Sequence, residues 1–258
     1  RRPPAPGRFP VSIDAIDRLQ RIGARIQSEG RVKVVELAAA FEVSEMTIRR
    51  DLDMLAEQGV VQRIRGGAVA IGPQPFAERF SRHVRAKDRI ASKLVPLVGD
   101  GGAIGIDAST TLQRLSVHLG DVRDLTVVTN GQDTFAALQD KPGVTALLTG
   151  GQLDHRTGSL VGPLATRTAH DVLLRRLFMS AAALHPAHGT SEATLEDAEV
   201  KLALADVAAE VVVAVDSSKL GQRAPARGLA PERVRVLVTE LDPDDQHLDA
   251  YRERWEVL

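Results

Sequence analysis

The sequence predicts an α/β protein of two domains, a small helical domain that ends in a β-hairpin and a larger domain with a mostly parallel sheet. In the first part of the chain, apolar residues recur at helical spacing, and a short alternating segment with two adjacent glycines follows them. In the second part, short apolar runs alternate with helical patterns, as in a parallel sheet covered by helices on both faces. A chain of 258 residues is long enough for two hydrophobic cores.

The distribution of charge separates the two parts. Residues 1–87 hold 16 Lys and Arg against 10 Asp and Glu, whereas residues 88–258 hold 17 against 24. A basic module joined to an acidic remainder implies that only the first part binds a polyanion. We expect a disordered basic tail over residues 1–12, the small domain over 13–70, a linker over 71–87 and the larger domain over 88–258.

Three helical patterns build the small domain. The first ends at Gly30, and its apolar or small face is formed by Ile16, Leu19, Gly23 and Ile26. The second covers residues 34–41, and its stripe is formed by Val34, Leu37, Ala38 and Phe41. The third follows after only Glu42 and Val43, with Ser44 as its N-cap. Its buried face is formed by Ile48, Leu52 and Leu55, which recur at i, i+4 and i+7.

Two helices joined by so short a turn are typical of a helix-turn-helix, which makes double-stranded DNA the first partner to consider. Met46 and Arg50 point almost opposite the buried stripe, and Thr47 and Arg49 lie on its flanks. Arg50 suits a bidentate contact with guanine O6 and N7, and Arg49 suits phosphate. Taken alone, an Arg-Arg pair is more typical of a solvated basic helix face.

The segment after the third helix predicts a wing. Residues 60–68 alternate apolar and basic residues and turn on Gly66 and Gly67, as a β-hairpin does. Arg63 and Arg65 are expected on one face of this strand, suited to the sugar-phosphate backbone. We therefore predict a winged helix-turn-helix. The predicted DNA contacts are Ser44, Met46, Thr47, Arg49, Arg50, Arg63 and Arg65.

In the larger domain the expected elements alternate along the chain. The predicted strands are residues 103–106, 125–128, 145–148, 177–183, 211–215 and 234–238. The predicted helices are residues 87–98, 110–119, 133–139, 163–173, 195–209 and 243–254.

Polar clusters follow four of the strands, where parallel sheets bind ligands. They are Asp107 with Ser109, Thr110 and Thr111; Thr129 with Asn130; Gly150 with Gly151; and Asp216 to Lys219. Each cluster alone is more typical of helix caps and turns. Together, with free helix N–H groups and the Lys219 cation, they indicate a site for an anionic small molecule.

These residues resemble the DeoR family of bacterial transcription regulators. The most specific match is Val32–Asp51, followed by Arg63–Ala68, where Arg65 replaces the histidine of the usual Arg-x-His-Gly-Gly-Ala. The resemblance implies a Rossmann-like domain related to ribose-5-phosphate isomerase, used as a phosphosugar sensor. The effector positions that it implies are Asp107, Ser109, Thr110, Thr111, Thr129, Asn130, Gly150, Gly151, Glu199, Lys201, Asp216 and Lys219. Ser109 replaces a usual glycine, and its Cβ narrows the backbone's approach to a phosphate.

The expected function is a homodimeric or homotetrameric DNA-binding repressor of sugar catabolism, released by a phosphorylated sugar. An activator of the same class uses the same residues. The other alternative is a sugar-phosphate isomerase with a DNA-binding head, in which Glu199 acts with Lys219 or Lys201. The lack of a clear acid-base constellation favours a protein that is not an enzyme.

The remaining composition excludes several other classes. The chain has no cysteine, which excludes disulfides and thiolate metal sites. No apolar run approaches the ~18 residues that a membrane span needs, so a cytoplasmic protein is expected. His185 and His188, with His155 and His170 elsewhere, are more typical of surface or ligand-lining residues than of a metal site. We expect neither a metal nor a cofactor.

Overall fold

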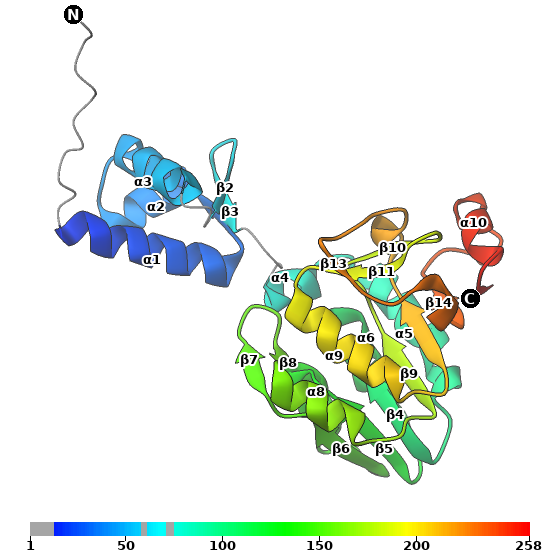
Figure 1. Cartoon of the computed structure of the whole chain (residues 1–258). Coiled ribbons are helices and arrows are strands. Elements are labelled where there is room, and N and C mark those ends of the chain that lie inside the picture. The colour runs from blue at the N-terminus through cyan, green and yellow to red at the C-terminus, as the bar shows by residue number, and fades with distance from the viewer. Residues whose placement is uncertain (1–12, 58–60, 71–74) are drawn as a thin grey trace, which may run out of the picture. The chain divides into compact units, whose positions relative to one another are not determined.

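The chain forms two compact units, one ending at Pro75 and the other beginning at Phe76 (Figure 1). This is a computed structural model, and it describes residues 13–57, 61–70 and 75–258. The predicted basic tail lies outside the described residues. The predicted linker over residues 71–87 is too long, because residues 76–87 already contain helix α4 (Phe76–Ser81) and the start of α5 (Val84–Val98). These helices pack within the larger unit, through the contacts of α4 and α5 with α6.

The small unit has the predicted three helices and the hairpin. Its elements are α1 (Ile13–Glu29), β1 (Arg31–Lys33), α2 (Val34–Phe41), α3 (Glu45–Glu57), β2 (Val61–Ile64) and β3 (Gly67–Ala70). The sheet order β1-β3-β2 is antiparallel, and β1 was not predicted. Ile26, Leu37, Ile48 and Leu52 form the core, as the stripes indicated. The buried face of α1 also includes Ile22, whereas Ile16 is 48% exposed and lies outside the core.

A buried ion pair joins the first and third helices. The Arg18 guanidinium contacts both carboxylate oxygens of Asp51, at 2.6 Å for Nε and 3.2 Å for Nη2. Asp51 is only 2% exposed and lies between Ile48 and Leu52 on the core side of α3. A planar guanidinium suits such a bidentate contact. The pair therefore fixes α3 against α1 by a directional contact in addition to apolar packing.

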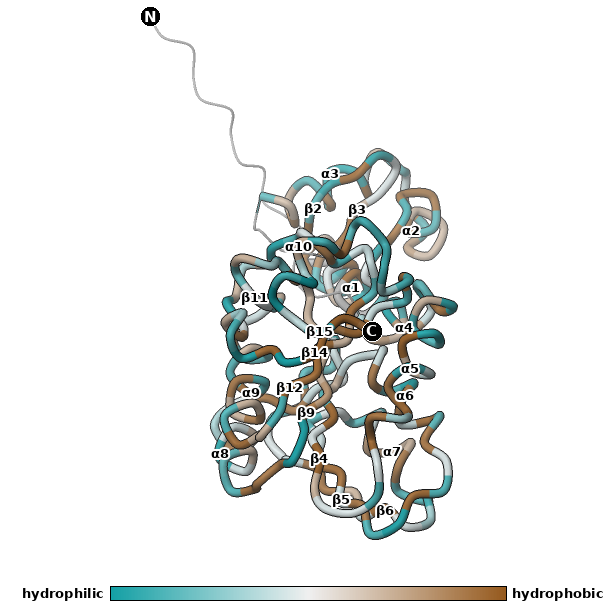
Figure 2. The backbone as a smooth tube through the Cα atoms, turned by 90° about the vertical axis from the view of Figure 1, so that its right-hand side faces the viewer, coloured by the Kyte–Doolittle hydropathy of each residue, from teal (hydrophilic) through white to brown (hydrophobic). Residues whose placement is uncertain are grey.

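The larger unit is a three-layer α/β domain with a seven-stranded parallel sheet (Figure 1). The strand order is β15 (Glu256–Val257), β14 (Val236–Val238), β12 (Val211–Ala214), β9 (Arg176–Met179), β4 (Gly102–Ile106), β5 (Leu125–Thr129) and β6 (Val144–Leu148). Figure 2 shows the central strands in hydrophobic colours. Side chains alternate between two cores along the central strands: Val213 faces one core and Val212 faces the other.

Helices cover both faces of this sheet. Helices α8 (Pro163–His170) and α9 (Leu195–Asp206) contribute to the core on one face. Helices α5, α6 (Thr110–His118) and α7 (Gln132–Leu138) contribute to the core on the other. Among the described residues, no helix combines the length and the apolar character that crossing a membrane requires.

Small antiparallel elements extend beyond the carboxyl ends of the central strands. A hairpin is formed by β7 (Gln152–Asp154) and β8 (Ser159–Val161), and a three-stranded sheet by β10 (Ala183–His185), β11 (Gly189–Glu192) and β13 (Ala226–Arg227). The single strand predicted over residues 177–183 is wrong, because the chain turns at Ser180 between β9 and β10. The helix predicted over residues 243–254 shortens to a 3₁₀ turn and the four-residue α10 (Asp249–Arg252).

We predict that Asp51→Ala destabilises the small unit by about 3–5 kcal/mol, because it leaves the largely buried Arg18 guanidinium without its carboxylate. Hydrogen exchange of the α1 and α3 amides in the full chain measures this loss directly. The matched control is Glu29→Ala, which removes the acid from the exposed Arg25–Glu29 pair of α1 and is expected to cost less than about 1 kcal/mol. Equal protection in the two variants would show that the Arg18–Asp51 pair contributes no more than a surface pair.

Candidate DNA-contacting surface and effector site

The N-terminal end of α3 carries the residues predicted to contact DNA. Ser44 caps the helix, and its Oγ accepts a hydrogen bond from the Thr47 N–H at 3.1 Å. Met46 is 60% exposed, and Arg50 is exposed one turn later. Arg49 pairs with Glu45 at 3.1 Å on the helix surface. The structure thus leaves Arg50 and Met46 facing solvent, while a local carboxylate offsets the charge of Arg49.

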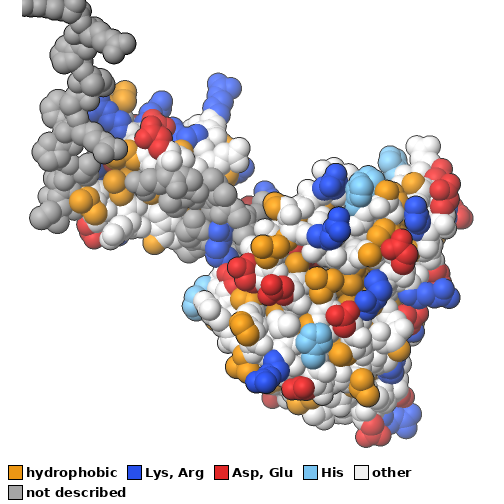
Figure 3. All heavy atoms as spheres, in the orientation of Figure 1, with side chains coloured by type: hydrophobic (Ala, Val, Ile, Leu, Met, Phe, Trp, Pro, Cys, Tyr) orange, Lys and Arg blue, Asp and Glu red, His pale blue; other side chains and the backbone are white. Residues whose placement is uncertain are grey.

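The two wing arginines differ in their surroundings. Arg63 bonds the Asp53 carboxylate of α3 at 2.8 Å and donates to the Gly67 carbonyl at 2.7 Å. Arg65 lies in the turn beyond β2 and is exposed, so the expectation that both arginines share one strand face is wrong. Arg63 links the wing to α3, and Arg65 extends at the tip of the hairpin. Figure 3 shows basic side chains on the small unit, and on the visible face of the larger unit basic, acidic and hydrophobic side chains are interspersed.

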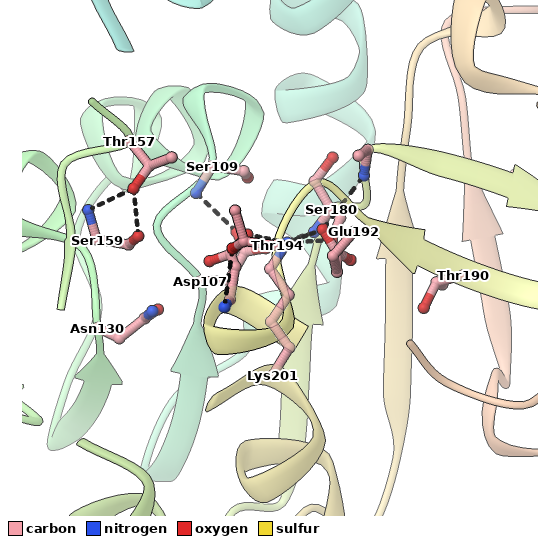
Figure 4. A network of polar contacts seen from close by, with 12 residues as sticks. Asp107, Ser109, Asn130, Thr157, Ser159, Ser180, Thr190, Glu192, Thr194 and Lys201 are labelled. Carbon is pink, nitrogen blue, oxygen red and sulfur yellow. Dashed lines mark hydrogen bonds and ion pairs between the residues drawn. The ribbon is translucent and has the colours of Figure 1, made fainter. Parts of the chain in front are cut away.

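In the larger unit, a buried polar cluster lies beyond the carboxyl ends of β4 and β9. We call it the edge site and define it by Asp107, Ser180, Glu192, Lys201 and Lys219. Asp107 is fully buried, and its two carboxylate oxygens accept hydrogen bonds from the Ser109 N–H at 2.9 Å and the Ser180 N–H at 2.8 Å. Figure 4 shows these contacts converging from separate elements. The turn after β9 is therefore held against the turn after β4.

Lys201 is the cation at the centre of the edge site. Its Nζ lies 2.8 Å from Glu192, 3.4 Å from Asp107 and 3.5 Å from Asp197. It also donates to the Ser180 carbonyl at 3.1 Å. Burial alone would lower the pKa of Lys201, but these three carboxylates outweigh burial and raise it above its ordinary value.

Glu192 titrates unusually within this cluster. Burial, opposed by Lys201 and reinforced by Asp197, raises the pKa of the Glu192 carboxyl to about 7. One ammonium cannot neutralise three carboxylates, so the least supported carboxylate keeps a proton most readily. The Glu192 Oε1 atom is buried and has no hydrogen-bond partner among the described residues. It can therefore carry that proton or accept a hydrogen bond from a ligand.

The hydroxyl and amide residues lie around the start of α6. Ser109 caps this helix, with the Leu112 N–H at 3.2 Å from its Oγ. Thr110, Thr111 and Asn130 are buried. The Thr111 Oγ1 and Asn130 Oδ1 atoms have no hydrogen-bond partner among the described residues, although the Asn130 amide donates to the Leu160 carbonyl at 3.3 Å. Buried polar atoms without partners are rare and typical of ligand sites.

Asp216 and Lys219 join the edge site from the end of β12. Asp216 is 2% exposed and caps the short 3₁₀ turn Ser217–Lys219. Lys219 Nζ donates to the Ser180 Oγ at 3.2 Å. Burial lowers the pKa of Lys219, and the Asp216 carboxylate opposes this effect. A cation that is destabilised in this way favours an added anion.

Other predicted residues lie apart from these contacts. Glu199 is exposed on α9, and Glu192 takes the place expected for it beside Lys201. The Thr129 Oγ1 accepts from the Gly131 N–H at 3.0 Å and stabilises the turn after β5. Gly150 and Gly151 have φ values of +70° and +115° and shape the turn from β6 to β7. A Cβ at Gly151 would lie 2.7 Å from the Val161 carbonyl, so this glycine is required for packing.

Two domain models of one protein family match this chain. The DeoR-like helix-turn-helix domain matches residues 18–74, and the DeoR C-terminal sensor domain matches residues 82–241, more than half of the chain. The protein belongs to the DeoR family. It is therefore a helix-turn-helix DNA-binding transcriptional regulator, as the opening residues of α3 indicated.

Several DeoR-family relatives match over most of their length. The regulator YulB of Bacillus subtilis (strain 168) is 32% identical, with 88% of this chain and 90% of YulB covered. The lactose phosphotransferase system repressor of Lactococcus lactis is 29% identical, with 93% and 97% covered. A putative aga operon transcriptional repressor of Escherichia coli O157:H7 is 27% identical, with 87% and 86% covered.

One similar solved structure is ribose 5-phosphate isomerase A from Neisseria gonorrhoeae. It is 20% identical over 53% of each chain, with a TM-score of 0.36. This value is too low to carry an argument about the activity of the present DeoR-family chain.

Sequence reasoning missed three charged residues near the edge site of this DeoR-family protein, namely Glu192, Arg79 and Lys87. Burial, reinforced by the neighbouring Lys219 charge, lowers the pKa of Lys87 to about 8. The signal for Lys87 was its position on the buried stripe of α5, in step with Ile90, Ala91 and Leu94. A lysine on an apolar stripe requires a polar partner, here the Arg79 carbonyl.

The imidazole rings of His185 and His188 pack against each other, with their centroids 4.7 Å apart. Within the described ranges, no group of three or more His, Asp or Glu side chains is arranged to hold a metal ion.

We predict that Glu192→Gln changes how stability depends on pH. Between about pH 4.5 and 7 the folded protein keeps a Glu192 proton that the unfolded chain releases. Stability from this group is therefore lost as pH rises through that window. The wild type should lose about 1–3 kcal/mol relative to Glu192→Gln between those pH values, measured by urea unfolding. The control is Glu199→Gln, which removes an exposed acid of α9, and parallel curves for all three proteins would contradict the prediction.

Proposed function

We propose that this DeoR-family regulator represses genes of sugar catabolism and leaves its operator when a phosphorylated sugar occupies the edge site. The observation that carries the proposal is a set of buried acceptor atoms without hydrogen-bond partners among the described residues. Glu192 Oε1 lies in the edge site with Lys219, and Thr111 Oγ1 and Asn130 Oδ1 follow the neighbouring strands β4 and β5. The printed functions of two relatives, repression of a lactose phosphotransferase system and of an aga operon, support a sugar-linked role.

The edge site offers complementary groups to the two halves of such a ligand. Lys219 and the N-terminal turn of α6 suit a phosphate, because a cation and free backbone N–H groups both favour negative charge. The acceptor atoms of Glu192 and Asn130 suit the hydroxyl groups of a sugar. Asp107 holds the Ser109 and Ser180 turns in place and already accepts a hydrogen bond on each carboxylate oxygen.

The protein binds DNA as a homodimer or homotetramer in this proposal. Paired recognition helices place their N-terminal ends in successive major grooves of an operator with repeated half-sites. The modest basic excess of residues 1–87 favours this arrangement, because one head neutralises few phosphates. Release follows when the effector binds one sensor conformation more tightly than the other.

We also propose that the protein is not an enzyme. Glu199, the expected base of an isomerase, is exposed, and Lys201 is engaged by three carboxylates. Glu192 has a pKa suited to a general base, so the isomerase alternative can be tested at this residue. Conversion of ribose 5-phosphate to its ketose by the purified protein, lost in Glu192→Gln, would support the enzyme. Deletion of the gene distinguishes a repressor, whose target transcripts rise, from an activator, whose target transcripts fall.

We predict that Arg50→Ala weakens binding to the protein's own promoter about 5- to 150-fold, because a bidentate arginine-guanine contact contributes about 1–3 kcal/mol. A gel shift at fixed moderate salt measures this loss. Arg25→Ala is the control, because it removes an arginine from α1 whose partner is Glu29. Promoter binding that is unchanged in Arg50→Ala would remove α3 from the interface.

We predict that at least one phosphorylated sugar raises the melting temperature of the wild type in a screen of ribose 5-phosphate, hexose 1-phosphates and hexose 6-phosphates. Lys219→Ala should abolish most of the shift, because it removes the phosphate-facing cation. Arg85→Ala, which removes an exposed cation of α5, should keep the shift. Shifts of equal size in wild type and Lys219→Ala would place the ligand elsewhere.

A further inference from the structure

Helix α4 occupies a distinctive position along the chain. It lies between the segments matched by the two domain models, residues 18–74 and 82–241, so neither match covers it. It is also the first helix of the larger unit after the boundary at Pro75. Any conformational change that the sensor transmits to the DNA-binding unit through the polypeptide chain must pass through α4. A residue of α4 that touches the effector would therefore connect the two activities.

Arg79 is the residue of α4 that faces the charged interior of the sensor. Its guanidinium is half-buried and interacts electrostatically with four carboxylates, of which Asp197, Asp107 and Glu192 also surround Lys201. Burial lowers the pKa of Arg79, and these carboxylates oppose that effect. Arg82, by contrast, is exposed just after the end of α4 and pairs with Glu78.

Three cations crowd one side of the edge site. Burial is the largest cause that lowers the pKa values of Lys219 and Lys87. The Arg79 charge lowers both further from their ordinary values, and the Lys219 charge contributes to lowering that of Lys87. The Lys87 ammonium donates to the Arg79 carbonyl, which holds the two residues together. Asp216 is the carboxylate that acts most strongly on both lysines. A doubly charged phosphate would relieve the repulsion among the three cations.

The anchoring of α4 also depends on the turn between β7 and β8. The Phe76 N–H donates to the Arg156 carbonyl at 2.6 Å, and the Arg79 Nη2 donates to the Thr157 carbonyl at 2.9 Å. The same hairpin also accepts a hydrogen bond from the Asn130 amide at the Leu160 carbonyl. A ligand that binds both Arg79 and Asn130 would therefore contact two residues that donate hydrogen bonds to the β7–β8 hairpin, and this hairpin also holds α4.

We propose that Arg79 is an effector-binding residue that contacts the ligand's phosphate together with Lys87 and Lys219, so that α4 responds directly to effector binding. This inference rests on the proposed function of the edge site. Helix α4 has only six residues and is held by a few contacts, so its order is sensitive to one strong added interaction. The effector then acts on the first helix after the boundary between the two units, without a separate relay through the sheet.

The test compares the wild type, Arg79→Gln and the control Arg82→Gln, which removes a cation of the same kind three residues away. Isothermal titration with inorganic phosphate, and with the sugar phosphate that most raises the wild-type melting temperature, measures affinity. Arg79→Gln should weaken both about 10- to 100-fold, as expected for loss of a charge-assisted hydrogen bond, and Arg82→Gln less than about twofold. Arg79→Lys should recover part of the affinity, because it restores the charge without the planar fork.

Hydrogen exchange of residues 76–81 tests the coupling. In the wild type, ligand should protect the α4 amides, and in Arg79→Gln at saturating ligand it should not. Unchanged exchange in the wild type overturns the coupling, and affinity equal to the wild type in Arg79→Gln overturns the role of Arg79 alone. A wild type that binds neither phosphate nor any sugar phosphate overturns the proposed effector site and this inference together. Circular dichroism melting of each unliganded variant identifies any that fails to fold.

Discussion

The architecture of the sensor domain depends on one buried ammonium group. Lys201 projects from α9 into a space where Asp107, Glu192 and Asp197 meet, and each carboxylate comes from a different part of the chain. Taking these charges out of water is costly, and their mutual attraction offsets the cost only when the geometry is good. Removing the ammonium would leave three buried or half-buried carboxylates together. The positions of α9, β11 and the turn after β4 are therefore interdependent.

The same requirement explains the irregular features at the carboxyl edge of the sheet. The chain leaves β9 at Ser180 because the Ser180 N–H bonds Asp107 while its carbonyl bonds Lys201. A strand that continued through this point would place both groups in a ladder instead. The antiparallel strands β10 and β11 then bring Glu192 back to Lys201. Regular structure ends where the polar site begins, as is usual for sites in parallel sheets.

The sequence predicted elements best where one periodicity was decisive. Helix α2 has the predicted bounds, and the polar residues after β4 and β12 are indeed near one another. Prediction failed where tertiary contacts override local pattern. Glu192 was missed because it ends a short strand with no apolar alternation, whereas Glu199 was taken from the family resemblance and faces solvent. Arg79 was assigned to a linker because a six-residue helix has too few turns to show a period.

The contact between Arg63 and α3 has a consequence for the kind of operator that this protein can read. Arg63 bridges Asp53 and the Gly67 carbonyl, and β3 pairs with β1, so the wing and the recognition helix form one body. In the proposed complex, the separation between the bases read by α3 and the backbone touched by Arg65 is then constant. Operators bound in the proposed way can differ in the spacing between half-sites, but the protein fixes the length of each half-site. Mutations that shift the wing would change which DNA lengths are recognised rather than which bases.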